Sequence, residues 1–67
     1  MLNASDKRNV VKTCQASSLL VQDLQGLVQS SNPLLADVAL EILQQALQIE
    51  LRLKRIESIA HNGEDSA

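Results

Sequence analysis

The residues with the greatest capacity for covalent or metal chemistry are one cysteine and one histidine, Cys14 and His61. A cysteine nucleophile needs an oriented base and a third group that positions it, and a structural zinc site needs four ligands. Cys14 falls in the apolar stripe of an expected helix, His61 falls near the end of a second helix, and no acid with a defined role accompanies them. We therefore expect a core cysteine and a solvated histidine, and predict no catalytic residue, metal or cofactor.

Basic residues are the second group with a possible chemical role, because several Lys or Arg side chains on one surface can bind phosphate. An antiparallel pair of helices would bring the following residues to one end: Lys7, Arg8, Lys12, Arg52, Lys54 and Arg55. Acidic Asp6, Glu50 and Glu57 interrupt this group, the net charge is −2, and no aromatic residue is present to stack on bases. Nucleic-acid binding is therefore the alternative hypothesis, and a solvated charged end is favoured.

Two long periodic segments carry these residues, separated by the sequence Ser30-Ser31-Asn32-Pro33. Asn before Pro is typical of an N-cap followed by the first helical position. We predict one helix over about 4–29, capped by Asn3 or Ser5, and a second over about 33–61. Asn62-Gly63 would then form a C-cap, and 62–67 an acidic tail. Gly26 is either an interior glycine or an early helix end, and the apolar period beyond it favours continuation.

The connection between these segments is short, which makes the two helices antiparallel neighbours. The chain has 67 residues and no Phe, Tyr or Trp, while Leu, Ile and Val supply its large apolar side chains. This composition favours helices over a sheet. The predicted fold is all-α, a single domain over 1–67 made of one antiparallel helical hairpin.

The first segment has one apolar face and the second has two. On a helix, positions three and four apart share a face. The face of the first segment comprises Val10, Cys14, Val21, Leu24 and Val28, with Ser17 inside it and Leu20 and Leu27 at one side. One row of the second segment comprises Leu35, Val38, Ile42, Ala46, Ile49, Leu53, Ile56 and Ala60. The other row comprises Leu40, Leu43, Leu47 and Leu51.

One antiparallel neighbour can cover only one row of the second segment, so the other would remain in water. So short a chain has little core, and oligomerisation is the usual remedy where disulfides and metals are missing. We predict that the row Leu40, Leu43, Leu47 and Leu51 is an oligomer interface. A homodimeric four-helix bundle, of coiled-coil type, is the expected assembly, with a tetramer left open. The alternative is a single hairpin that covers both rows in part.

Charge predicts how two hairpins would be arranged. The basic residues lie toward the termini, whereas Asp23, Asp37 and Glu41 lie toward the connection. Two hairpins with their loops at opposite ends would match opposite charges, and loops at the same end would repel.

Leu19 suggests a second contact, because it points nearly opposite to the apolar face of its segment. We interpret it as a candidate for binding a protein partner; the alternative is a singly exposed leucine without a role. Because the sequence offers no catalytic constellation, the leading hypothesis is a non-enzymatic helical adaptor or regulator. It would act by binding a protein partner such as a transcription regulator, as an antirepressor does. A third hypothesis is a structural subunit of a larger helical complex.

In topology and length the expected hairpin resembles the small plasmid-encoded Rop hairpins. That resemblance implies a dimeric four-helix bundle that binds RNA, and it is the form that the nucleic-acid alternative would take. It extends to no individual residue of this chain.

The N-terminal sequence has no apolar run behind a basic segment, which argues against a signal peptide. No stretch approaches the roughly 20 apolar residues of a membrane span. A lone cysteine fits a reducing compartment. The expected location is the cytoplasm, with no membrane partner.

Overall fold

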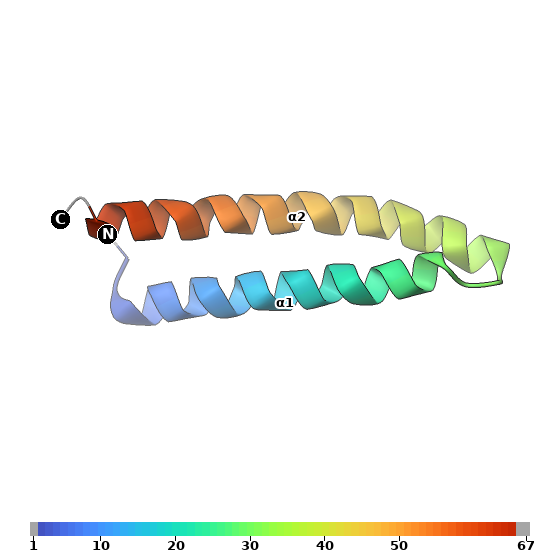
Figure 1. Ribbon diagram of the computed structural model, residues 1–67, viewed down its shortest axis with the longest axis horizontal. Coiled ribbons are helices and arrows are strands. Elements are labelled where there is room, and N and C mark those ends of the chain that lie inside the picture. Colours follow the sequence, from blue (N-terminus) through green and yellow to red (C-terminus); the bar gives the residue numbers. More distant parts are fainter. Residues whose placement is uncertain (1, 66–67) are drawn as a thin grey trace.

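The chain folds into two long helices packed side by side as a hairpin. The computed structural model describes residues 2–65, with side chains described through residue 60. Helix α1 (Ala4–Val28) is followed by helix α2 (Pro33–Asp65), which runs back antiparallel to α1 (Figure 1). The hairpin measures 51 × 16 × 13 Å. The predicted all-α hairpin is therefore confirmed.

Helix α1 begins where the sequence predicted, because Asn3 caps it. The Asn3 side chain accepts a hydrogen bond from the backbone N–H of Asp6 at 2.8 Å. This satisfies one of the N–H groups that the first turn of a helix leaves without a partner. Of the two predicted caps, Asn3 and Ser5, the structure has Asn3.

The turn between the helices is held by side chains that accept backbone hydrogen bonds. Asn32 Oδ1 accepts from the N–H groups of Leu34 and Leu35 at 3.0 and 3.2 Å. Ser30 Oγ accepts from the N–H of Asn32 at 3.0 Å. Pro33 is the first residue of α2, where its missing N–H has no intrahelical acceptor in any case. The predicted start of α2 is confirmed.

The two glycines lie within the helices. Helix α1 continues through Gly26 to Val28, as the apolar period beyond the glycine predicted. Helix α2 runs to Asp65, so it passes Asn62-Gly63 rather than ending at about His61. A single glycine lowers helix stability by only about 1 kcal/mol and therefore does not have to end a helix. The side chain of His61 and residues 66–67 lie outside the described part of the chain.

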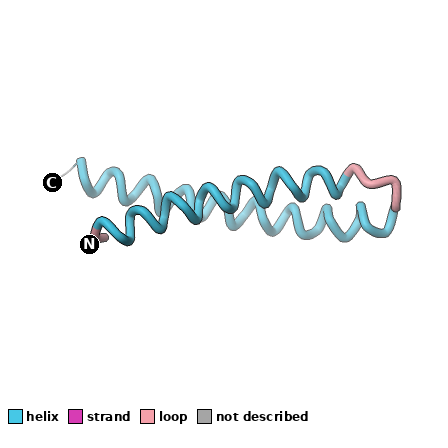
Figure 2. The backbone as a smooth tube through the Cα atoms, turned by 90° about the horizontal axis from the view of Figure 1, so that it is seen from below, coloured by secondary structure: helices cyan, strands magenta, loops and turns pink. Residues whose placement is uncertain are grey.

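The helices pack along a seam of residues spaced alternately three and four apart. In α1 the buried members are Cys14, Ser17, Val21 and Leu24, and the half-buried ones are Val10 and Val28. In α2 the buried members are Ala39, Leu43 and Ala46, and the half-buried ones are Ala36, Glu50, Leu53, Glu57 and Ala60. This seven-residue pattern is that of a coiled coil. In a view turned by 90° about the long axis of the hairpin, the two helices are seen to cross at an angle (Figure 2).

The seam falls between the two apolar rows of α2 and not along either of them. Val21 and Leu24 pack with Leu43 and Ala46 in the centre of the hairpin. Leu43 is only 9% exposed, although the sequence placed it in the row left uncovered. The physical reason is that Ala39 and Ala46 allow close approach of α1, so the face with the smallest side chains turns inward. Leu43 of one row and Ala46, Leu53 and Ala60 of the other are seam residues, and the remaining members of both rows lie at the sides of the seam.

Neither helix has, among its described residues, a stretch long and apolar enough to cross a membrane.

Candidate interaction surface

One side of the seam carries a continuous aliphatic surface to which both helices contribute. Its members repeat every seven residues on each helix and remain between 42% and 51% exposed. We call it the isoleucine face, and it comprises Leu20, Leu27, Leu35, Ile42, Ile49 and Ile56. Val38, 46% exposed, lies beside it on α2.

The helix geometry places these six side chains on one side. Leu20 and Leu27 each precede a seam residue of α1 (Val21 and Val28), and the four α2 residues each precede a seam residue of α2. In an antiparallel pair of helices, residues that directly precede such seam positions lie on the same flank of both helices. Polar Asp6 and Thr13 continue the α1 row toward the N-terminus. In the half near the turn these positions are all aliphatic, and exposed Asp23 lies beside them on α1.

The opposite side of the seam carries a shorter aliphatic row on α2 alone. Leu40, Leu47 and Leu51 are between 43% and 52% exposed, and we call them the leucine row. The neighbouring positions of α1 carry mainly polar side chains, among them Ser18, Gln22 and Gln25. Of the interface predicted from the sequence, these three leucines are exposed together, whereas Leu43 is buried in the seam.

Beside the leucine row, a polar contact joins the two helices. Ser18 Oγ donates a hydrogen bond to Glu50 Oε2 at 2.6 Å, and Lys54 Nζ lies 3.9 Å from the same oxygen. Glu50 is a half-buried residue of the seam, so its charge needs such partners. This group places hydrogen-bonded polar atoms where the isoleucine face has only aliphatic ones.

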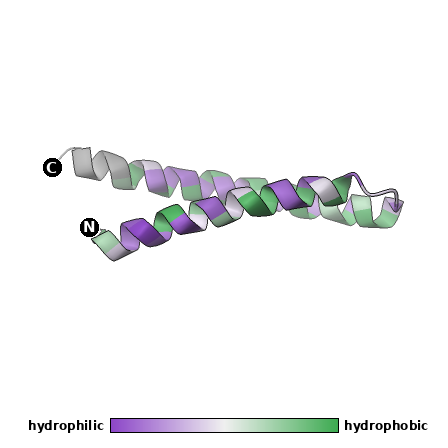
Figure 3. Cartoon of the chain, turned by 60° about the horizontal axis from the view of Figure 1, so that its bottom comes forward, coloured by the Kyte–Doolittle hydropathy of each residue, from purple (hydrophilic) through white to green (hydrophobic). Residues whose placement is uncertain are grey.

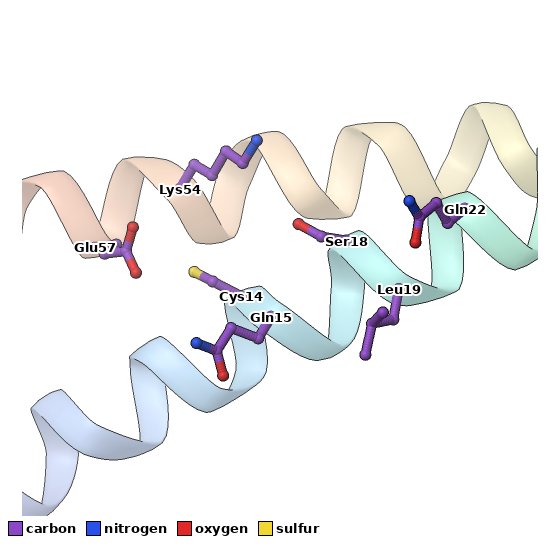
Figure 4. A pocket seen from close by; sticks show the side chains of 7 residues that line it. All are labelled: Cys14, Gln15, Ser18, Leu19, Gln22, Lys54 and Glu57. Atoms are coloured by element: carbon purple, nitrogen blue, oxygen red, sulfur yellow. The ribbon is translucent and has the colours of Figure 1, made fainter.

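Cys14 lies in the same region, next to a shallow open hollow (Figure 4). The residues lining the hollow are Cys14, Gln15, Ser18, Leu19, Gln22, Lys54 and Glu57. Burial raises the pKa of the Cys14 thiol, the nearby charge of Glu57 raises it further, and Lys54 partly offsets this. A raised pKa disfavours the thiolate, which is the nucleophilic form. Within the described residues, no three Cys, His, Asp or Glu side chains gather to hold a metal ion.

The six basic residues lie in the open half of the hairpin, where hydrophilic colours gather on α2 (Figure 3). They are distributed around both helices and do not form one patch. Lys12 and Arg55 each lie on the side of their own helix away from the seam, so they point in opposite directions. Lys54 is paired with Glu50. Lys7 is half-buried at the end of the seam.

Leu19, the predicted partner contact, is 61% exposed and lies on the outer side of α1. It borders the hollow beside Cys14, between Gln15 and Gln22 (Figure 4). It belongs to neither aliphatic surface, because it lies away from both flanks of the seam.

The fold and these surfaces define an all-α helical hairpin with two partly exposed aliphatic flanks. The chain matches no protein-family model, no curated protein and no solved structure.

The isoleucine face was not recognised as a unit from the sequence. Its members belong to separate stripes of the two segments, and the sequence alone does not give the register between α1 and α2 that joins them. The signal was present in the seven-residue spacing of 20 and 27 in α1 and of 35, 42, 49 and 56 in α2. That spacing, taken together with the spacing of the seam, places the two rows on one flank.

Proposed function

We propose that this chain is a non-enzymatic interaction protein that associates with a copy of itself into a four-helix bundle and, in that form, binds another protein. The observation that carries the proposal is the aliphatic surface left half exposed on both flanks of the seam. Contiguous exposed apolar surface on a small protein commonly marks an interaction site.

The energetics support association. Covering the exposed half of a Leu or Ile side chain contributes about 1 kcal/mol, which is half of the value for complete burial. Six such side chains on each copy would together represent a large share of the roughly 5–15 kcal/mol that stabilises a typical domain. A lone hairpin of two helices has a thin core, with no large side chain fully buried among its described residues. Association would supply the missing core.

The leucine row supports binding of a second kind of partner. It is a single row of three leucines along one helix, bordered by polar side chains of the other helix. An amphipathic helix of another protein needs only such a row, with polar groups at its margins. A two-fold dimer would present two copies of this row, which suits a partner that is itself dimeric, such as a transcription regulator. The proposed action is to occupy that partner.

The experiment is capture of partners from the native host's extract after nuclease treatment, with the chain tagged. The matched pair of baits is the wild-type chain and the double substitution Leu40→Gln and Leu47→Gln. We expect the wild-type chain to retain a protein that the substituted chain loses, while both keep the same mass in solution. A protein bound equally by both baits, or binding that nuclease abolishes, would contradict the proposal.

A further inference from the structure

We propose that the isoleucine face takes a second copy of this chain, packed with its loop at the opposite end, so that α2 lies against α2 of the second copy. This inference deepens the proposed function and rests on its self-association.

The choice of flank follows from what α1 contributes. A four-helix bundle is made by two hairpins meeting face to face, so both helices of each hairpin must present apolar surface. On the isoleucine face, Leu20 and Leu27 extend the aliphatic row of α2 across to α1. On the other flank, α1 presents Ser18 bonded to Glu50, together with glutamines, and its one aliphatic residue there, Val11, is already half-buried. Covering that flank with a hairpin would bury polar groups that now face water.

The spacing of the row makes α2 complementary to itself. If two copies of α2 run antiparallel about a two-fold axis, Leu35 meets Ile56 of the second copy and Ile42 meets Ile49 of the second copy. All four residues of α2 are then covered by aliphatic side chains. In α1, the same axis passes close to Leu20, which meets Leu20 of the second copy. Such self-matching pairs are what a two-fold interface requires.

The other two-fold arrangement, with both loops at one end, pairs α1 with α2 of the second copy. Because Asp6 and Thr13 continue the α1 row, they would then face the open-end isoleucines of the second copy, Ile56 and Ile49. A carboxylate against an isoleucine loses hydration without gaining a partner. With the loops at opposite ends, Asp6 lies beyond the end of the second copy's α1 and stays in water.

Charge favours the same orientation. Three acidic residues lie near the turn, in a half of the hairpin that contains no Lys or Arg: Asp23, Asp37 and Glu41. The six basic residues all lie in the open half. Loops at opposite ends set Asp37 and Glu41 of each copy beside the basic half of the other copy, and loops at the same end set six carboxylates together. Asp23 directly precedes a seam residue, as Gln45 does, and lies near the proposed axis, so it does not contribute to this preference.

The test uses two neighbouring glutamines as sites for crosslinking. Gln45 lies on the flank of the isoleucine face near the proposed axis, whereas Gln44 lies on the flank of the leucine row, and both are exposed. In a full-length chain with Cys14→Ala, either Gln45→Cys or Gln44→Cys is introduced. Each variant is treated with a short bismaleimide at the same concentration, after its mass has been measured by sedimentation equilibrium.

We expect both variants to be dimers, and only the Gln45→Cys chain to be crosslinked efficiently, with a yield at least about tenfold above that of its neighbour. Efficient crosslinking through Gln44→Cys would assign the dimer to the leucine row and overturn the inference. Dimers that neither cysteine crosslinks would overturn the orientation, since loops at one end separate the two copies of residue 45. Monomers in both cases would contradict the self-association itself, which distinguishes failure of the proposed function from failure of this inference.

Discussion

The two flanks of the hairpin have similar aliphatic rows on α2 but different neighbours on α1. In the isoleucine face, α1 contributes Leu20 and Leu27; beside the leucine row, α1 carries Ser18 and glutamines. An exposed row on one helix is suited to one further helix, whereas a row that continues onto the adjacent helix is suited to another hairpin. Which partner a surface fits is thus decided by the helix next to it. Substitutions in the isoleucine face, in the leucine row and in the seam should therefore have different effects.

The largest effect is expected when charge is placed on the isoleucine face. The double substitution Ile42→Glu and Ile49→Glu should convert the dimer to monomers, because carboxylates would be buried against aliphatic side chains. A cost of several kcal/mol raises the dissociation constant of the dimer about a hundred-fold or more. Sedimentation equilibrium measures it. The matched control, Leu40→Glu with Leu47→Glu, should leave the mass unchanged; a control that dissociates equally would show that the flanks are not different.

Next in size is the effect of shortening a side chain in the seam. Leu43→Ala should lower the free energy of unfolding by about 2–3 kcal/mol, because Leu43 packs with Val21 and Leu24 in the centre of the hairpin. Leu47→Ala, in the exposed leucine row, should cost under about 1 kcal/mol. Urea unfolding of the two variants at equal concentration compares them. Equal losses would mean that Leu43 is not a core residue.

A moderate effect is expected at the turn. Asn32→Ala should cost about 1 kcal/mol, because the side chain accepts two backbone hydrogen bonds at the start of α2. Asn32→Asp keeps the acceptor and should be close to neutral. Since residue 32 lies on neither flank, both variants should keep the wild-type mass. Thermal unfolding followed by circular dichroism gives the comparison, and an unaffected Asn32→Ala chain would contradict the capping role.

A smaller, stabilising effect is expected at Gly26. A methyl group added there would meet nothing within 4 Å apart from the adjoining residues and backbone of its own helix, and the residue lies inside α1. Gly26→Ala should therefore raise the free energy of unfolding by up to about 1 kcal/mol, by reducing the freedom of the unfolded chain. The residue is on the outer side of the helix, so the mass should again be unchanged. A loss of stability would indicate that something covers this position in solution.

The smallest effect concerns pH and the seam cysteine. Burial and Glu57 raise the pKa of Cys14 above its ordinary value of 9.0. Stability is therefore fully present below that value and falls as pH rises toward the folded-state pKa, because the unfolded chain loses the proton first. Unfolding of the wild-type and Cys14→Ala chains, followed into the alkaline range, should show the wild type losing relative stability. A difference independent of pH would contradict the raised pKa.

The sequence was sufficient for the elements of the hairpin and for the inner face of α1. Asn32-Pro33 marked the start of α2, Asn3 was among the predicted caps of α1, and the apolar stripe containing Cys14, Ser17 and Val21 is the one that packs inward. These features depend on local hydrogen bonding and on one well-separated stripe, which a single sequence displays directly.

The inner face of α2 could not be predicted in the same way. It contains alanines at 39 and 46 and glutamates at 50 and 57, so it has little hydrophobic signal of its own. Which face of α2 packs against α1 depends on how closely the two helices can approach each other, and this is a property of the packed pair. The rows of larger side chains on either side give the stronger hydrophobic signal, so the sequence favours them as the packing faces. The isoleucine face could not be predicted for the same reason, because the sequence does not give the register between α1 and α2.

The most direct measurement of the central claim is the mass of the unmodified chain by sedimentation equilibrium at micromolar concentration. A hairpin that needs a second copy to cover its isoleucine face should sediment as a helical particle of twice the 7.3 kDa chain. A fully helical, cooperatively unfolding particle of 7.3 kDa under the same conditions would contradict the claim.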